Sequence, residues 1–200
     1  MSGNPENALL KGVSRSFYIT LRLLPGPMRG AASLGYLLAR TSDTLADTAV
    51  VSLAVRLQCL DSFERALSGK EVVPSWPLEM WNGVVDAGER LLLGRSGELF
   101  EWLGRIPAAE AELIREVVGI IISGQKLDLE RFTRADGDHP LALENDAALE
   151  DYAWRVAGCV GAFWTKLGFL TMGERFSQAP ESRLIEQGIA YGKGLQLVNI

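Results

Sequence analysis

Cysteine and histidine, which build many metal and redox centres, are scarce: the chain has two cysteines and one histidine in 200 residues. Cys59 and Cys159 lie far apart and lack the close spacing of a zinc or redox motif. We interpret both as reduced, packed thiols, which favours a cytoplasmic location. The single histidine, His139, falls in an expected loop and carries no predicted role.

The sequence also lacks a basic block, a leader and a long apolar run. Its formal net charge is −5 and its pI is about 5.0, and basic residues are scattered singly, which argues against a nucleic-acid binder. The first residues have neither the basic nor the apolar region of a signal peptide. No uncharged apolar stretch nears the ~18 residues needed to span a bilayer. A membrane-spanning helix is therefore not predicted, although a lipid could still be the substrate.

Apolar residues with helical periodicity are abundant in the chain. Hydrophobic residues make up 48% and charged residues 22%, enough for one sizeable core. Because repeats, low-complexity tracts and linkers are missing, residues 1–200 are predicted to form one all-α domain. Helices are expected at 6–24, 28–48, 52–67, 78–93, 108–132, 149–163 and 181–200, with loops at 71–77 and 134–145. Residues 117–122 could also form a strand, but no partner strand is predicted, which favours a buried helix.

The expected helix at 28–48 carries a polar stripe. At about 100° per residue, Tyr36, Arg40, Asp43 and Asp47 share one face. Acidic residues one turn apart also occur on ordinary solvated helix faces. Here the rest of the helix is apolar nearly all round, which is typical of a helix that is buried in a bundle and lines a cavity. Two carboxylates in such a place suit Mg²⁺, whose shell is completed by substrate phosphates and water.

Other helical positions could face a ligand. Small residues at 157, 158, 161 and 162 allow another helix or a long ligand to approach closely. Gln196 and Asn199 lie on one face of the last expected helix. Gln125 and Asp128, one turn apart, either face the same cavity or belong to a hydrated helix flank.

Four segments, in this order, resemble the squalene and phytoene synthase family of head-to-head prenyl transferases. Residues 14–18 resemble its N-terminal Ser-Lys/Arg-Ser-Phe signature, and residues 40–47 resemble its first aspartate-rich motif. Residues 152–161 are similar to its Tyr-x-x-x-Val-Ala-Gly-x-Val-Gly segment, and residues 195–200 to the lead-in to its second aspartate-rich motif. Each match is weak or moderate alone, but the ordered set spans nearly the whole chain and is specific.

The resemblance implies an isoprenoid synthase fold, a helical bundle around a central cavity, and Mg²⁺-dependent prenyl transfer. We expect the parent enzyme to condense two farnesyl diphosphates head to head, through presqualene diphosphate, to squalene. The alternative is phytoene or dehydrosqualene synthesis, which shares the first half-reaction and differs in prenyl length and in the use of NADPH. Lipid products favour work at a membrane surface, although nothing in the sequence anchors the chain, and the oligomeric state is left open.

At the diphosphate end of the substrate, the resemblance implies that Asp43 and Asp47 hold Mg²⁺ and that Arg40 adds charge-assisted hydrogen bonds. The other implied diphosphate contacts are Ser14, Arg15, Ser16, Gln196 and Asn199. For Ser14, the alternative role is to cap a helix.

At the hydrocarbon end, the resemblance implies a channel that excludes water and accommodates the prenyl tails, lined by residues such as Phe17, Val156 and Gly158. Tyr36 and Tyr152 would face the reacting carbons, where an aromatic ring stabilises a carbocation. A buried core residue with a satisfied hydroxyl is the alternative for either tyrosine.

The sequence departs from the family in two places. The Arg-Asp pair and further aspartate of the second metal motif are missing, and the last expected helix stops at Ile200 without a capping residue. We therefore expect a fragment that lacks the C-terminal helices of the bundle, with a non-catalytic prenyl-diphosphate-binding subunit as the alternative. Arg155 stands where the family often has an aromatic or polar residue.

Overall fold

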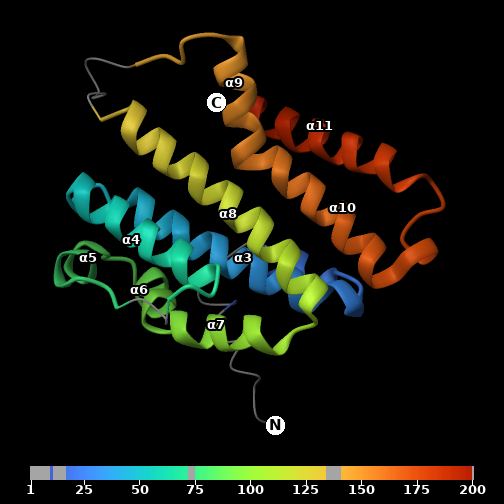
Figure 1. Cartoon of the computed structure of the whole chain (residues 1–200), viewed down its shortest axis with the longest axis horizontal. Coiled ribbons are helices and arrows are strands. Elements are labelled where there is room, and N and C mark those ends of the chain that lie inside the picture. Colours follow the sequence, from blue (N-terminus) through green and yellow to red (C-terminus); the bar gives the residue numbers. More distant parts are fainter. Residues whose placement is uncertain (1–9, 11–16, 72–74, 134–140, 200) are drawn as a thin grey trace. The chain divides into compact units, whose positions relative to one another are not determined.

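The computed structural model describes residues 10, 17–71, 75–133 and 141–199, and every regular element in these ranges is helical (Figure 1). The predicted all-α class is therefore confirmed for the described part of the chain. Internal contacts divide the chain into two compact units, 1–111 and 112–200, which are described separately below. One domain over 1–200 stays a prediction.

The first unit is built on α3 (Gly26–Asp47), which is its longest helix. The helices that pack on α3 are α2 (Phe17–Leu23), α4 (Leu53–Leu67), α6 (Ala87–Gly94) and α7 (Ser96–Arg105), while α5 (Leu78–Gly83) packs on α4. The leucines at 34, 37, 38 and 45 are fully buried and form the core side of α3. The helix begins two residues earlier than expected, because proline at position 27 is tolerated in a first turn.

Two sequence expectations for this unit need correction. The single helix expected at 78–93 is divided into α5 and α6, because Asp86 is extended and its side chain accepts a hydrogen bond from the Glu89 backbone, which starts a new helix. Helix α7 was not expected, since glycines at 97 and 104 weaken its intrinsic propensity. It forms because Leu99, Trp102 and Leu103 are buried on one side.

The second unit contains α8 (Ala108–Arg131), which starts just before the boundary, followed by α9 (Asp146–Ala153), α10 (Cys159–Met172), the short 3₁₀ turn η2 (Gly173–Arg175) and α11 (Glu181–Asn199). Between α9 and α10 lies a π-helical turn, η1 (Trp154–Gly158). The helical state of α8 settles the choice between helix and strand at 117–122. The π turn was not expected, and such turns often mark functional sites.

Helix α11 packs very closely against η1 and α10, which run beside it in Figure 1. A Cβ atom on Gly161 would stand 1.9 Å from the Gly188 carbonyl oxygen, and one on Gly192 would stand 2.3 Å from the Ala157 carbonyl oxygen. No side chain fits at such distances, so glycine is required on both sides of the crossing. The small residues at 157, 158, 161 and 162 therefore allow close packing against another helix, α11.

One continuous helical run, Asp146–Arg175, is long and apolar enough to cross a membrane by length and composition alone, since an 18-residue window within it has a mean hydropathy of 1.2. A buried core helix passes the same test. Since η1 and α10 within this run pack on α11, we interpret it as a core helix of the second unit.

Candidate functional site

The predicted polar stripe exists in the first unit. Arg40 lies one turn from Asp43, with 4.0 Å between its Nη1 atom and the Asp43 Oδ2 atom. The Arg40 charge also acts on Tyr36 and on Asp47, so all four side chains share one electrostatic neighbourhood. The structure therefore brings together the four residues that the helical period places on one face.

Burial shifts the pKa of two side chains in this stripe. It raises the pKa of the Tyr36 hydroxyl, with Arg40 opposing the shift and Asp43 adding to it. Asp47 reaches solvent at the end of α3, yet the protein atoms around it raise the pKa of its carboxyl, against the opposing charges of Arg40 and Arg56. At Asp47, the nearby positive charges thus do not outweigh the cost of desolvation.

Glu89 is a member of this neighbourhood that the sequence did not reveal. The Arg40 Nη2 atom donates to the Glu89 Oε1 atom at 2.5 Å, and both side chains are half-buried. Glu89 comes from α6, far from Arg40 in sequence, so helical periodicity could not connect the two. An acidic residue in the first turn after the Asp86 cap was the only available signal.

The donor set of the stripe fits a hard divalent cation. Asp43 and Asp47 offer carboxylate oxygens, the ligand type that Mg²⁺ prefers. Within the described residues, no group of three or more histidine, cysteine, aspartate or glutamate side chains could enclose a metal ion. A cation held by these two aspartates would therefore draw its remaining ligands from a bound substrate or from water.

In the second unit, Tyr152 and Gln196 are brought together as a pair. The Gln196 Nε2 atom donates to the Tyr152 hydroxyl oxygen at 3.0 Å, joining α11 to α9. Asn199, the other residue predicted on this face, is exposed in the last described turn of α11. Among the described residues, Gln196 is thus the predicted diphosphate-binding amide that contacts another predicted site residue.

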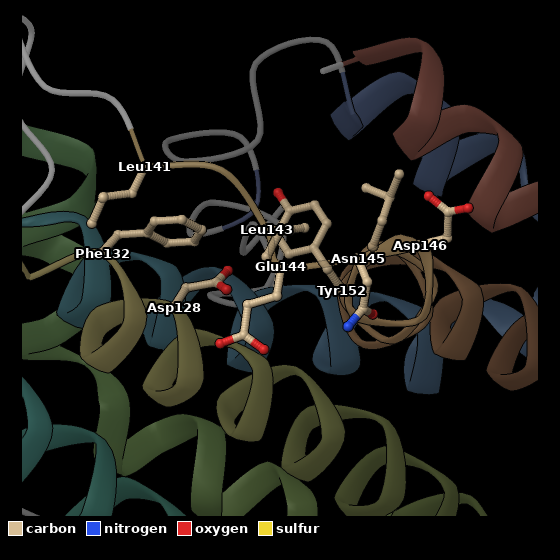
Figure 2. Close-up of a pocket in the computed structure, with 9 residues that line it drawn as sticks. Asp128, Phe132, Leu141, Leu143, Glu144, Asn145, Asp146 and Tyr152 are labelled. Atoms are coloured by element: carbon tan, nitrogen blue, oxygen red, sulfur yellow. The ribbon is translucent and has the colours of Figure 1, made fainter.

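A pocket of about 790 Å³ opens beside Tyr152, large enough for an elongated hydrocarbon. Figure 2 shows the Tyr152 ring and the Asp128 carboxylate among the side chains that border it. Its apolar lining comes from Phe132, Leu141, Leu143 and Leu149, and its polar lining from Asp128, Glu144, Asn145, Asp146 and Tyr152. Asp128, for which the sequence left two interpretations open, therefore faces a cavity.

The chain matches the squalene/phytoene synthase family over residues 10–200. It belongs to this family. The match covers the stripe on α3, the π turn and the Tyr152–Gln196 pair. The resemblance inferred from the four sequence segments is thereby confirmed.

Two fungal proteins named as phytoene synthases are similar to this chain. The chain is 28% identical over 192 residues to a bifunctional lycopene cyclase/phytoene synthase of Arthroderma gypseum, and 27% identical over 196 residues to one of Phaeosphaeria nodorum. Both alignments cover 96% of this chain but only 31% and 30% of those proteins.

Solved structures of TcSQS with bound ligands are also similar. The first has a TM-score of 0.69 at 25% identity and the second a TM-score of 0.66 at 23% identity. Each comparison covers 92% of this chain and 49% of the TcSQS chain, so the present chain spans about half of that length. These similarities confirm the predicted isoprenoid synthase fold class.

The remaining predicted family residues are placed as follows. Ser14, Arg15 and Ser16 lie outside the described residues, and so does the side chain of Phe17, whose backbone begins α2. Val156 is half-buried in the π turn. Gly158 is buried against α11, where an added Cβ atom would stand 3.1 Å from Cγ of Lys193. The roles of these residues in substrate binding stay predictions.

Proposed function

We propose that the chain forms part of an enzyme that joins two prenyl diphosphates head to head, with farnesyl diphosphate as substrate and squalene as product by way of presqualene diphosphate. One observation carries the proposal: Tyr36, Arg40, Asp43 and Asp47 share one neighbourhood on α3 in a chain of this family. The two carboxylates can hold a cation that binds a diphosphate, the guanidinium can donate to the phosphate oxygens, and the aromatic ring can face an allylic carbon.

The first step in such a reaction is the loss of diphosphate from one substrate. Mg²⁺ held by Asp43 and Asp47 would neutralise the charge of the leaving group. Arg40 can donate to the same phosphate oxygens, since its guanidinium has five donors and Glu89 engages one side of it. Ser14, Arg15 and Ser16 are proposed to add donors there.

The second requirement is a dry place for the allylic cation and the prenyl tails. Tyr36 and Tyr152 are proposed to stabilise the cation with their ring faces. Gln196 fixes the Tyr152 hydroxyl through its 3.0 Å hydrogen bond, so the ring has a defined orientation. Tyr152 would also help to move the proton that is lost when the cyclopropyl intermediate closes, with the released diphosphate as the base.

Phytoene or dehydrosqualene synthesis is the second candidate, and the names of the two fungal relatives favour it. The first half-reaction is the same. The outcomes differ in the prenyl length that is accepted and in whether NADPH reduces the final cation, so NADPH belongs only to the squalene proposal. We propose a cytoplasmic enzyme that receives its lipid substrates at a membrane surface.

The test is a product assay with the 200-residue chain and, in parallel, the protein that the complete gene encodes. Each is incubated with Mg²⁺ and either farnesyl or geranylgeranyl diphosphate, with and without NADPH, and the products are identified by mass spectrometry. Squalene from farnesyl diphosphate with NADPH supports the first proposal, and phytoene from the longer substrate supports the second. Mg²⁺-dependent binding of diphosphate without any product from either protein would instead identify a non-catalytic binding subunit.

A further inference from the structure

Arg155 occupies an unusual place in the second unit, inside the π turn that links α9 to α10. Its Nε atom donates to the Asp151 Oδ2 atom at 2.9 Å, and its Nη1 atom donates to the Ser123 hydroxyl oxygen at 2.7 Å. The Ser123 hydroxyl in turn donates to the Ile120 carbonyl at 2.6 Å, which leaves its oxygen as an acceptor. One guanidinium therefore connects α9, η1 and α8.

The backbone of α8 is shaped to receive the Arg155 side chain. A Cβ atom on Gly124 would stand 2.9 Å from Cβ and 3.5 Å from Cδ of Arg155. The arginine stem thus lies where any other residue at 124 would place its side chain, and the neighbouring Ser123 accepts the guanidinium. We call Ser123, Gly124, Asp151 and Arg155 the arginine clamp.

Tyr152 lies in the chain between two residues of the clamp, Asp151 and Arg155. It follows Asp151 directly, and it precedes the π turn, where the regular i to i−4 spacing of the helix is lost. Its hydroxyl meets Gln196, and it borders the pocket together with Asp128 of α8. The distance between these two pocket residues is therefore set by how α9 and η1 are attached to α8.

We propose that Arg155 is a positioning residue for Tyr152, in which the arginine clamp fixes the junction of α9 and η1 against α8 and so sets where the Tyr152 ring stands in the pocket. The proposal rests on the proposed function only where it concerns turnover. Arg155 suits this task because its planar guanidinium presents donors to two partners in a fixed geometry, whereas a lysine ammonium is a point charge on a flexible stem.

The chain offers a matched control for the clamp. Lys166 of α10 donates to Glu116 of α8 at 2.6 Å, and its side chain is 31% exposed, as is that of Arg155. One pair of side chains joins α8 to the same helical run in each case, Lys166–Glu116 by an ion pair and Arg155–Ser123 by a hydrogen bond. Arg155 also binds Asp151, which directly precedes Tyr152. Loss of either pair should lower the free energy of unfolding by a similar amount, whereas only loss of the clamp should change the environment of the Tyr152 ring.

The first experiment measures the Tyr152 environment directly and needs no turnover. The chain is labelled with 3-fluorotyrosine, whose four sites give separate ¹⁹F signals, and Tyr152→Phe assigns the relevant one. We expect Arg155→Gln and Gly124→Ala to shift or broaden the Tyr152 signal, Arg155→Lys to restore part of it, and Lys166→Gln to leave it unchanged. A Tyr152 signal that coincides with wild type in both Arg155→Gln and Gly124→Ala would overturn the proposal.

Circular dichroism accompanies each variant, and Arg155→Lys, which keeps the charge and most of the stem, carries the test if Arg155→Gln does not fold. The second experiment uses the protein that the complete gene encodes. There Arg155→Gln should lower kcat about tenfold to a hundredfold, since small misplacements of a reacting group have effects of this size, with KM changed less than about threefold. An unchanged kcat would contradict the proposal. Absence of product from the wild type would count against the proposed function only, because the ¹⁹F result stands independently.

Discussion

The Arg40 guanidinium is bound more tightly to Glu89 of α6, at 2.5 Å, than to Asp43 on its own helix, at 4.0 Å. The residue that the sequence assigned to the substrate diphosphate is therefore already anchored by the protein. This anchor leaves the other edge of the guanidinium facing the acidic stripe, and it fixes the arginine before a substrate arrives.

A double-mutant cycle on Arg40→Gln and Glu89→Gln should give a coupling energy of about 1 kcal/mol, because both side chains are only 34% and 26% exposed. Urea denaturation of the four proteins supplies the free energies of unfolding. The Arg65–Glu71 pair, at 46% and 42% exposure, is the control and should couple more weakly. Equal coupling in the two cycles would show that the first pair has no special role in anchoring Arg40.

Asp43→Asn and Asp47→Asn should each reduce Mg²⁺-dependent affinity for inorganic diphosphate, and should lower turnover by at least about a hundredfold, as expected when several kcal/mol of charge stabilisation are lost. Isothermal titration with and without Mg²⁺ measures the first effect, and product formation by the complete gene product measures the second. Asp61→Asn, which removes an exposed acid of α4, is the control. Wild-type affinity in both motif variants would refute the metal assignment.

The crossing of α10 and α11 predicts opposite effects for two glycines. Gly161→Ala should destabilise the chain by roughly 1–3 kcal/mol or more, because its Cβ atom would meet the Gly188 carbonyl oxygen at 1.9 Å. Gly194→Ala has open space around it and should stabilise α11 by about 0.5–1 kcal/mol through helix propensity. Thermal and urea unfolding compare the two, and equal changes of the same sign would contradict the close crossing.

Features with a strong helical period were predictable from the sequence. The stripe on α3 and the helix at 53–67 follow directly from apolar residues at three- and four-residue steps. The small residues at 157–162 predicted a close approach, but not whether a helix or a ligand makes it. Packing, rather than pattern, decided that question.

Features that depend on contacts between distant segments were not predictable. Glu89 reaches Arg40 from another helix, and Arg155 reaches Ser123 from a π turn that has no recognisable sequence period. No role for Arg155 could be predicted from the sequence, because its contact with Ser123 joins two helices that are far apart in the chain. Helix α7 was missed because local propensity is low where burial supplies the stability.

Both cysteines should be inert in the folded protein. Burial raises the pKa of Cys59 to about 11 and that of Cys159 to about 12, so almost no thiolate exists near pH 8. We expect no alkylation of either thiol by iodoacetamide at pH 8 in buffer and full alkylation of both in urea, as read by mass spectrometry. Rapid labelling without urea would show that the thiols are not packed as described.

Asp128 should make the free energy of unfolding fall as the pH rises, which is opposite to the usual effect of an aspartate. Burial raises the pKa of its carboxyl, Arg131 of the same helix opposes the shift, and the charge of Asp151 adds to it. Because the folded state then binds the proton more tightly than the unfolded state, the free energy of unfolding falls as pH rises from the ordinary aspartate range through the raised pKa. This loss of stability is fully present at pH values above the Asp128 pKa of the folded state, and it is absent below the pKa of the unfolded state.

Asp128→Asn removes this cost, so the variant should be more stable than wild type near pH 7, and the difference should shrink as the pH is lowered below the ordinary aspartate pKa of about 3.9. Urea denaturation across pH 3–7 measures the difference, and Glu130→Gln, which changes an exposed acid of α8, serves as the control. A difference that grows on acidification would mean that the Asp128 carboxylate is stabilised in the folded state. The pocket beside Tyr152 would then favour the charged form of Asp128, contrary to the desolvation that raises its pKa.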